Sequence, residues 1–188
     1  MANLKIGIDP SINSTGICIR NEDTGSTFYY IIASKMTKKM KEFKHNYVKF
    51  CPYEKIDAKE GDYSLKENKK FSNIIQICSK ISDIIGLLKD PNNNIKVYME
   101  GVSYGSVGSA ALVDLSFLNA SIRMTLRYLD IPFTIVSPTS LKKFACANGQ
   151  ADKIIMIDAW KRLDKNISDI NDIKIDDLAD SYFLSRYS

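Results

Sequence analysis

Close to its start the chain reads IGIDPSINSTGICI, residues Ile6 to Ile19, an apolar strand pattern interrupted by a carboxylate and a turn. The alternation before Asp9 predicts a buried strand that reaches solvent at Asp9. Pro10 cannot donate a hydrogen bond to a sheet, so it marks a turn. The turn continues through residues that favour it, namely Asn13, Ser14 and Gly16. Two interpretations fit: a hairpin in which Asp9 only caps the turn, or a central strand that presents Asp9 to a metal ion or a phosphate.

The chemistry open to the chain is limited by its composition. A length of 188 residues, 45% hydrophobic and 26% charged, is typical of one globular domain, residues 1–188. No apolar run approaches the roughly 18 residues of a membrane span, and MANLKIGID lacks the apolar core of a signal peptide, so we expect a cytoplasmic protein with no membrane partner. The four cysteines are scattered and His45 is the single histidine, which disfavours zinc sites and serine-histidine catalysis. Any hydrolysis would therefore depend on carboxylates.

Basic residues gather in one part of the chain. Between Lys35 and Lys70 there are eleven Lys against six Asp or Glu, although the net charge of the whole chain is only +4. We interpret residues 35–64 as a basic insertion with little regular structure, which is either a solvated loop or a surface for a polyanion. Its lysines alternate with aromatic residues, which could stack on unpaired bases or anchor a folded arm. The candidate DNA contacts here are Lys38, Lys39, Lys41 and Lys44.

The hydrophobic periodicity predicts a mixed α/β fold. Three antiparallel strands lead into an amphipathic helix over residues 65–88, and the strand IKVYME then ends on Glu100. A glycine-serine loop, a helix over residues 109–129, the strand PFTIVS and further helices follow. This order favours a mixed sheet with helices on both faces, in which the first and fourth strands can be neighbours. Asp9 and Glu100 would then lie close together.

A third acidic cluster lies in the last predicted helix. Asp177 and Asp180 are three residues apart and share one helical face, where like charges destabilise unless a cation neutralises them. The helix N-terminus accounts well for Asp176 but poorly for Asp180, which lies a turn further in. Oxygen ligands without His or Cys suit Mg²⁺ or Mn²⁺. Three acidic groups at two strand ends and one helix therefore indicate a divalent metal site.

In these motifs the sequence resembles the RuvC family of Holliday-junction resolvases, within the ribonuclease H-like superfamily. The family's opening motif resembles GIDPSINSTG. Its glutamate-bearing strand and helix, especially in the sequences of phage-type members, resemble YMEGVSYGSVGSAALVDLSFLNASIR. SPTSLKKFACANGQADK and DDLAD resemble its later blocks. The resemblance covers nearly the whole chain outside residues 35–64. It implies a ribonuclease H-like α/β domain with a mixed five-stranded sheet.

Residue by residue, the resemblance implies a metal-binding and catalytic quartet of Asp9, Glu100, Asp177 and Asp180. Lys153 matches the family lysine near the scissile phosphate, and Lys142 matches another functionally important basic position. Lys142 and its neighbour Lys143 are candidate DNA contacts. The family aromatic that touches junction bases stands three residues after the glutamate, where this chain has Ser103; Tyr104 is the nearest candidate for that role. Two Mg²⁺ ions per site are implied, with Mn²⁺ as a substitute.

The function implied by the resemblance is metal-dependent nicking of four-way (Holliday) junctions by a homodimer, in recombination and repair in a bacterial cell, possibly phage-encoded. A nuclease of broader specificity for flaps, forks and three-way junctions is an alternative, because the same metal site would act on a phosphate in any branched DNA. A non-catalytic DNA-binding protein is a further alternative, although all four carboxylates are present. A sugar-kinase or actin-like ATPase would need a second lobe that a chain of this length lacks.

Overall fold

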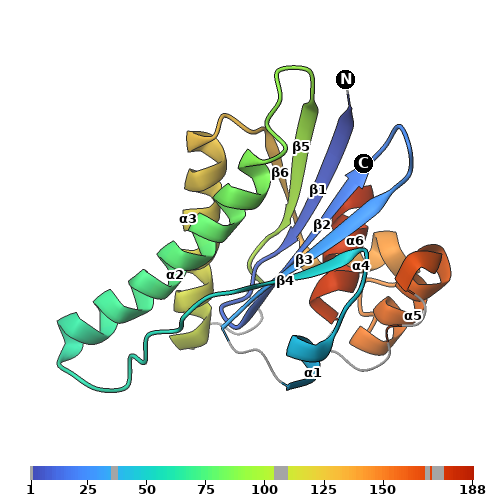
Figure 1. Cartoon of the computed structure of the whole chain (residues 1–188). Helices are drawn as coiled ribbons and strands as arrows, with labels where there is room; N and C mark the ends of the chain where they lie inside the picture. Colours follow the sequence, from blue (N-terminus) through green and yellow to red (C-terminus); the bar gives the residue numbers. More distant parts are fainter. Residues whose placement is uncertain (1, 35–37, 104–109, 168–169, 171–175) are drawn as a thin grey trace.

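In the computed structural model the strands form one six-stranded mixed sheet (Figure 1). The structure describes residues 2–34, 38–103, 110–167, 170 and 176–188. The sheet order is β4-β3-β2-β1-β5-β6. The strands are β1 (Asn3–Asp9), β2 (Ser14–Asn21), β3 (Thr27–Ala33), β4 (Val48–Pro52), β5 (Asn94–Glu100) and β6 (Phe133–Val136).

Two kinds of pairing meet at β1. On one side β1, β2 and β3 form the predicted antiparallel meander, with Ile6 opposite Ile19. On the other side β1 pairs in parallel with β5, and β5 pairs in parallel with β6. The expected adjacency of the first strand and the strand that ends on Glu100 is confirmed. β1 and β5 therefore end at the same edge of the sheet.

The helices cover both faces of the sheet (Figure 1). One face is covered by the paired helices α2 (Tyr63–Gly86) and α3 (Ala110–Tyr128). On the other face α6 (Asp176–Arg186) packs directly on β1 and β2, and α4 (Pro138–Cys146) and α5 (Lys153–Leu163) pack beside it. The fold is thus the predicted α/β class with helices on both faces.

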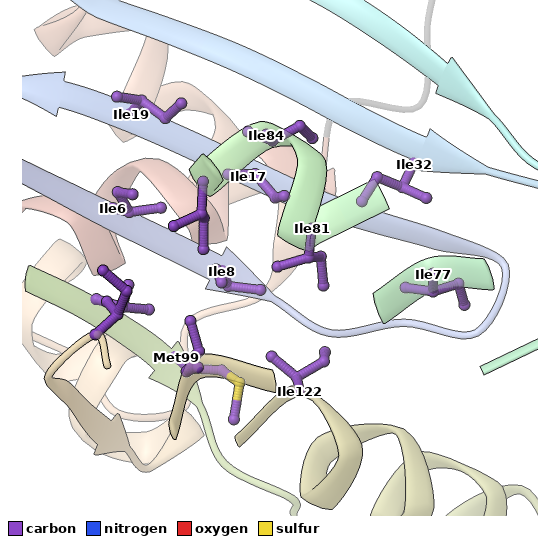
Figure 2. Packing of buried hydrophobic residues seen from close by; sticks show 14 of the residues in the cluster. Ile6, Ile8, Ile17, Ile19, Ile32, Ile77, Ile81, Ile84, Met99 and Ile122 are labelled. Atoms are coloured by element: carbon purple, nitrogen blue, oxygen red, sulfur yellow. The ribbon is translucent and has the colours of Figure 1, made fainter. Parts of the chain in front are cut away.

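Isoleucine dominates the core under α2 and α3. Figure 2 shows Ile6, Ile8 and Ile17 of the sheet against Ile81 of α2 and Ile122 of α3. β-branched side chains suit a pleated surface, and their burial against an amphipathic helix stabilises both elements. A second core lies under α6 and is built around Trp160, Tyr182 and Phe183.

The prediction of five strands and of little regular structure over residues 35–64 is wrong. That segment contains a short helix, α1 (Lys38–Glu42), and β4, which extends the sheet in parallel with β3. β4 lies at the edge and exposes Lys49, a common way to protect an open edge from further pairing. Its hydrophobic pattern is weak because the strand depends on hydrogen bonds offered by β3.

Both ends of α4 have defined caps. Ser137 caps the N-terminus, and its hydroxyl accepts a hydrogen bond from the Ser140 amide at 3.1 Å. The left-handed residue that ends α4 is Ala147, with φ of 56°. Within the described part of the chain, no helix is long and apolar enough to cross a membrane.

Candidate metal and phosphate site

Two strand ends place the first pair of carboxylates. Ile8 of β1 pairs with Met99 of β5, so the next residues, Asp9 and Glu100, lie side by side at one edge of the sheet. Asp9 is buried, with 8% of its surface exposed. The amide of Asn119 on α3 donates to the Glu100 carbonyl at 2.9 Å, which fixes the end of β5.

Two glycines bring the second pair of carboxylates to the first. A Cβ atom at Gly7 would lie 1.9 Å from the Ser181 carbonyl oxygen, and one at Gly16 would lie 2.2 Å from the Asp177 carbonyl oxygen. Gly16 also pairs with Asp9 in the β1–β2 register. Only residues without a side chain allow α6 to pack so closely on the strands. The close packing carries Asp177 and Asp180 to the end of β1.

All four carboxylates line one cavity of about 390 Å³. The wall also includes two basic side chains, Lys142 of α4 and Lys153 of α5. Lys153 is the first residue of α5, directly after the N-cap Asp152. The remaining lining residues are Ser11, Gly101, Ser103, Leu115, Pro138 and Met156. The cavity therefore combines clustered acids with lysines suited to a phosphate.

Burial and charge act together on Asp9 and Glu100. The pKa of Asp9 is raised well above its ordinary value of 3.8, first because burial disfavours the charged form, and then because Glu100, Asp180 and Asp177 carry the same charge. Burial also raises the pKa of Glu100. A hydrogen bond with Asp9 and the positive charges of Lys142 and Lys153 act in the opposite direction and lower it. Both carboxyl groups therefore bind a proton more tightly than isolated carboxyl groups do.

The donor chemistry fits a hard divalent cation. Across the described residues, no three His, Cys, Asp or Glu side chains form a ready metal-binding group. The cavity wall nevertheless offers four carboxylates and neither His nor Cys, which is the chemistry that Mg²⁺ and Mn²⁺ prefer. Mg²⁺ usually keeps several waters and takes only one or two carboxylates, so it does not require three converging protein ligands.

The predicted DNA contacts are more dispersed. Lys142 lies on the cavity wall, whereas Lys143 is exposed on α4 and is not among the lining residues. Lys38 and Lys44 are exposed, in and just after α1, and are not among the lining residues. Tyr104 falls outside the described residues, and the same holds for the side chains of Lys39 and Lys41.

Most aromatic residues of the basic segment serve packing inside the protein. Phe43 contacts His45 and Phe50, and both Phe43 and Phe50 pack against the core under α6. Tyr53 is buried, and Tyr63 is 81% exposed at the start of α2. The anchoring interpretation therefore holds for Phe43, Phe50 and Tyr53.

Sequence reasoning missed several residues that shape the site. The sequence predicts that Gly16 is a turn residue, but it lies inside β2, where the backbone of α6 comes close to the strand. Thr15 is buried, and its hydroxyl donates to the Ser11 carbonyl at 2.7 Å, which closes the turn after Asp9. The strand pattern that resumes immediately after the Thr-Gly pair was the available signal.

The comparisons with known proteins are structural. The sequence matches no family model and no curated protein. Thermus thermophilus RuvC superposes with a TM-score of 0.58 at 12% identity, over 97% of this chain and 90% of that chain. T. thermophilus RuvC in complex with Holliday junction substrate gives 0.56 at 11% identity over the same shares. An Aquifex aeolicus PPX-GPPA enzyme reaches only 0.38, too low to show a shared fold. The chain thus has the ribonuclease H-like fold of the RuvC structures.

Proposed function

We propose that the chain is a metal-dependent endonuclease that nicks branched DNA, with four-way junctions as its main substrate. The observation that carries the proposal is the single cavity where Asp9, Glu100, Asp177 and Asp180 meet Lys142 and Lys153. Neither fold nor composition would require four acids and two lysines at one place. The structural likeness to RuvC, one structure of which contains a Holliday junction substrate, supports the choice of DNA.

Asp9, Glu100, Asp177 and Asp180 would hold Mg²⁺ or Mn²⁺, with two ions per site. Bound there, the metal would supply an activated water for attack on a phosphodiester and stabilise the leaving 3′ oxygen. The products would carry 5′-phosphate and 3′-hydroxyl ends.

The lysines on the cavity wall have a separate task. Lys153 would neutralise the non-bridging oxygens of the phosphate as charge develops on them, and Lys142 would hold the same strand. Lysine suits this role because its ammonium group binds phosphate as a point charge. Lys143, Lys38, Lys39, Lys41, Lys44 and Tyr104 would extend the DNA contacts beyond the cavity.

A second copy of the chain would complete the enzyme. Phe71 and Ile75 of α2 and Phe117 and Met124 of α3 are each half exposed or more, so the protein's own core does not use them. Together with neighbouring residues, three of them line an apolar groove of about 380 Å³ between the helices, namely Phe71, Ile75 and Met124. A twofold dimer through α2 and α3 would bury this surface. Two active sites related by that axis would match the two symmetric strands of a junction.

A cleavage panel tests the proposal. Four-way, three-way, flap and linear duplex DNA are incubated with the protein in Mg²⁺ or Mn²⁺, with Asp9→Asn as the control for contaminating nuclease. We expect paired nicks in the four-way junction and little cleavage of linear duplex. Cleavage of every branched form at similar rates would favour the broader nuclease. No cleavage in either metal, with intact junction binding, would favour the non-catalytic DNA-binding protein.

A further inference from the structure

The segment that follows β4 is fastened to α2. We call residues 53–57 the strap. The side chain of Asn73, which is buried on α2, accepts from the Ile56 amide at 2.8 Å and donates to the Ile56 carbonyl at 2.9 Å. Gln76 donates to the Glu54 carbonyl at 2.8 Å. These contacts hold an otherwise irregular segment in one position against a long helix.

From that position the strap contacts the turn that follows Asp9. The hydroxyl of Tyr53 donates to the Ile12 carbonyl at 2.5 Å, and the Lys55 ammonium donates to the Asn13 side chain at 3.0 Å. The Tyr53 ring is buried in the core under α2 and α3, and the Ile12 side chain packs against the same core. Turn and strap are therefore joined by both hydrogen bonds and apolar packing.

The turn also has hydrogen bonds with Thr15 of β2 and with Ser34, the residue just after β3. The Thr15 hydroxyl contacts both the amide and the carbonyl of Ser11, at 3.2 and 2.7 Å. The Ser34 amide donates to the Asn13 carbonyl at 3.3 Å. Ile12 lies between these two points, and its carbonyl accepts from Tyr53. The strap therefore supports the middle of the turn.

We infer that Tyr53 is a positioning residue for the Asp9 carboxylate, and that the strap is a brace for the turn of residues 10–13. Because Asp9 is the last residue of β1, its direction at the cavity depends on where the turn leaves the sheet. The effect of the strap on catalysis rests on the proposed nuclease function, whereas its effect on the turn does not. Small displacements of a catalytic group can cost on the order of a hundredfold in rate.

The test compares Tyr53→Phe with Tyr63→Phe. Both remove one hydroxyl and keep the ring, but Tyr63 is exposed and far along the chain from the turn. Amide hydrogen exchange is measured over residues 11–14 in the full chain without metal. We expect exchange to accelerate on the order of tenfold in Tyr53→Phe, because the hydrogen bond that holds the Ile12 carbonyl is removed, and to stay unchanged in Tyr63→Phe. Equal exchange in the wild type and Tyr53→Phe would overturn the brace.

Kinetics then separate positioning from general stability. In Tyr53→Phe we expect kcat on junction DNA to fall on the order of tenfold or more with KM unchanged, and Lys55→Met, a surface change, should produce a smaller fall of the same kind. A change in KM alone, or an unchanged kcat in both variants, would overturn the positioning role. Hydrogen exchange decides on the brace even where the wild type cuts no DNA, an outcome that would overturn the proposed function instead.

Discussion

Asp9 and Glu100 end two neighbouring parallel strands, and their carboxyl groups share a hydrogen bond at the wall of the cavity. Loss of contact with water raises both pKa values, so the pair binds a proton more tightly than isolated carboxyl groups do. Substitution of Asp9 therefore tests both the stability of the metal-free protein and the proposed metal binding and cleavage.

Asp9→Asn should stabilise the metal-free protein at neutral and alkaline pH. The folded-state pKa of Asp9 is raised, so its contribution to stability is fully present below the ordinary value of 3.8 and is lost as pH rises through the folded value. Asparagine stays neutral and avoids that loss. Thermal melts in EDTA from pH 4 to 8 should show a gain for Asn at pH 8 that shrinks toward pH 4.

Asp23→Asn is the control for this pH dependence. The pKa of Asp23 is lowered, mainly by its hydrogen bond with the Asn3 side chain, so its contribution has the opposite sign and is lost as pH falls. That variant should show no gain at pH 8. If Asp9→Asn and the wild type have the same melting temperature at every pH, Asp9 is not a buried carboxyl group with a raised pKa.

Gly16→Ala should destabilise the protein and disturb the site. The added methyl group would lie 2.2 Å from the Asp177 carbonyl oxygen, so α6 must move away from β2. Overpacking of this kind typically costs about 1–3 kcal/mol. We expect a fall in Tm of roughly 5 °C in thermal melts. Gly86→Ala is the control, since nothing lies within 4 Å of its Cβ, and it should melt at or above the wild-type temperature.

Phe71→Asp should prevent dimerisation without unfolding the protein. Phe71 is 53% exposed in the apolar groove between α2 and α3, where a charge would oppose burial against a second copy. Leu87→Asp, on an exposed residue just beyond α2 that does not line the groove, is the control. Sedimentation at micromolar protein should show a dimer for the wild type and Leu87→Asp and a monomer for Phe71→Asp. Monomeric wild type, with and without junction DNA, would refute the dimer.

Replacing Lys38, Lys39, Lys41 and Lys44 with Gln should weaken junction binding and flatten its salt dependence. The slope of affinity against salt should fall by about one unit for each phosphate that a lysine no longer neutralises. The control is the double variant Lys89→Gln with Lys96→Gln. Lys96 lies near the start of β5, whereas Glu100 and the cavity lie at its other end. Binding is measured by fluorescence anisotropy across a range of salt concentrations. Wild-type affinity and slope in the fourfold variant would show that this segment does not bind DNA.

Local pattern was enough to predict the strands and helices outside residues 35–64 and the end of β1 that carries Asp9, because strand and helix periodicity shows directly in the order of apolar side chains. Parallel pairing with the strand of Glu100 followed from the order of elements. β4 could not be predicted, since its pairing depends on the open edge of β3. The contacts of Gly7 and Gly16 with α6, and of Tyr53 with Ile12, join segments far apart in sequence, and a glycine or tyrosine alone does not indicate its distant partner.

Cleavage by Asp9→Asn is the most direct test of the nuclease proposal. Single-turnover cutting of a four-way junction in Mg²⁺ is compared for the wild type, Asp9→Asn and the exposed control Asp23→Asn, with junction affinity measured in EDTA. We expect Asp9→Asn to cut slower by orders of magnitude while binding as tightly or more tightly, because a negative charge facing phosphate is removed. Asp23→Asn should match the wild type. Near wild-type cutting by Asp9→Asn would contradict the assignment of the active site.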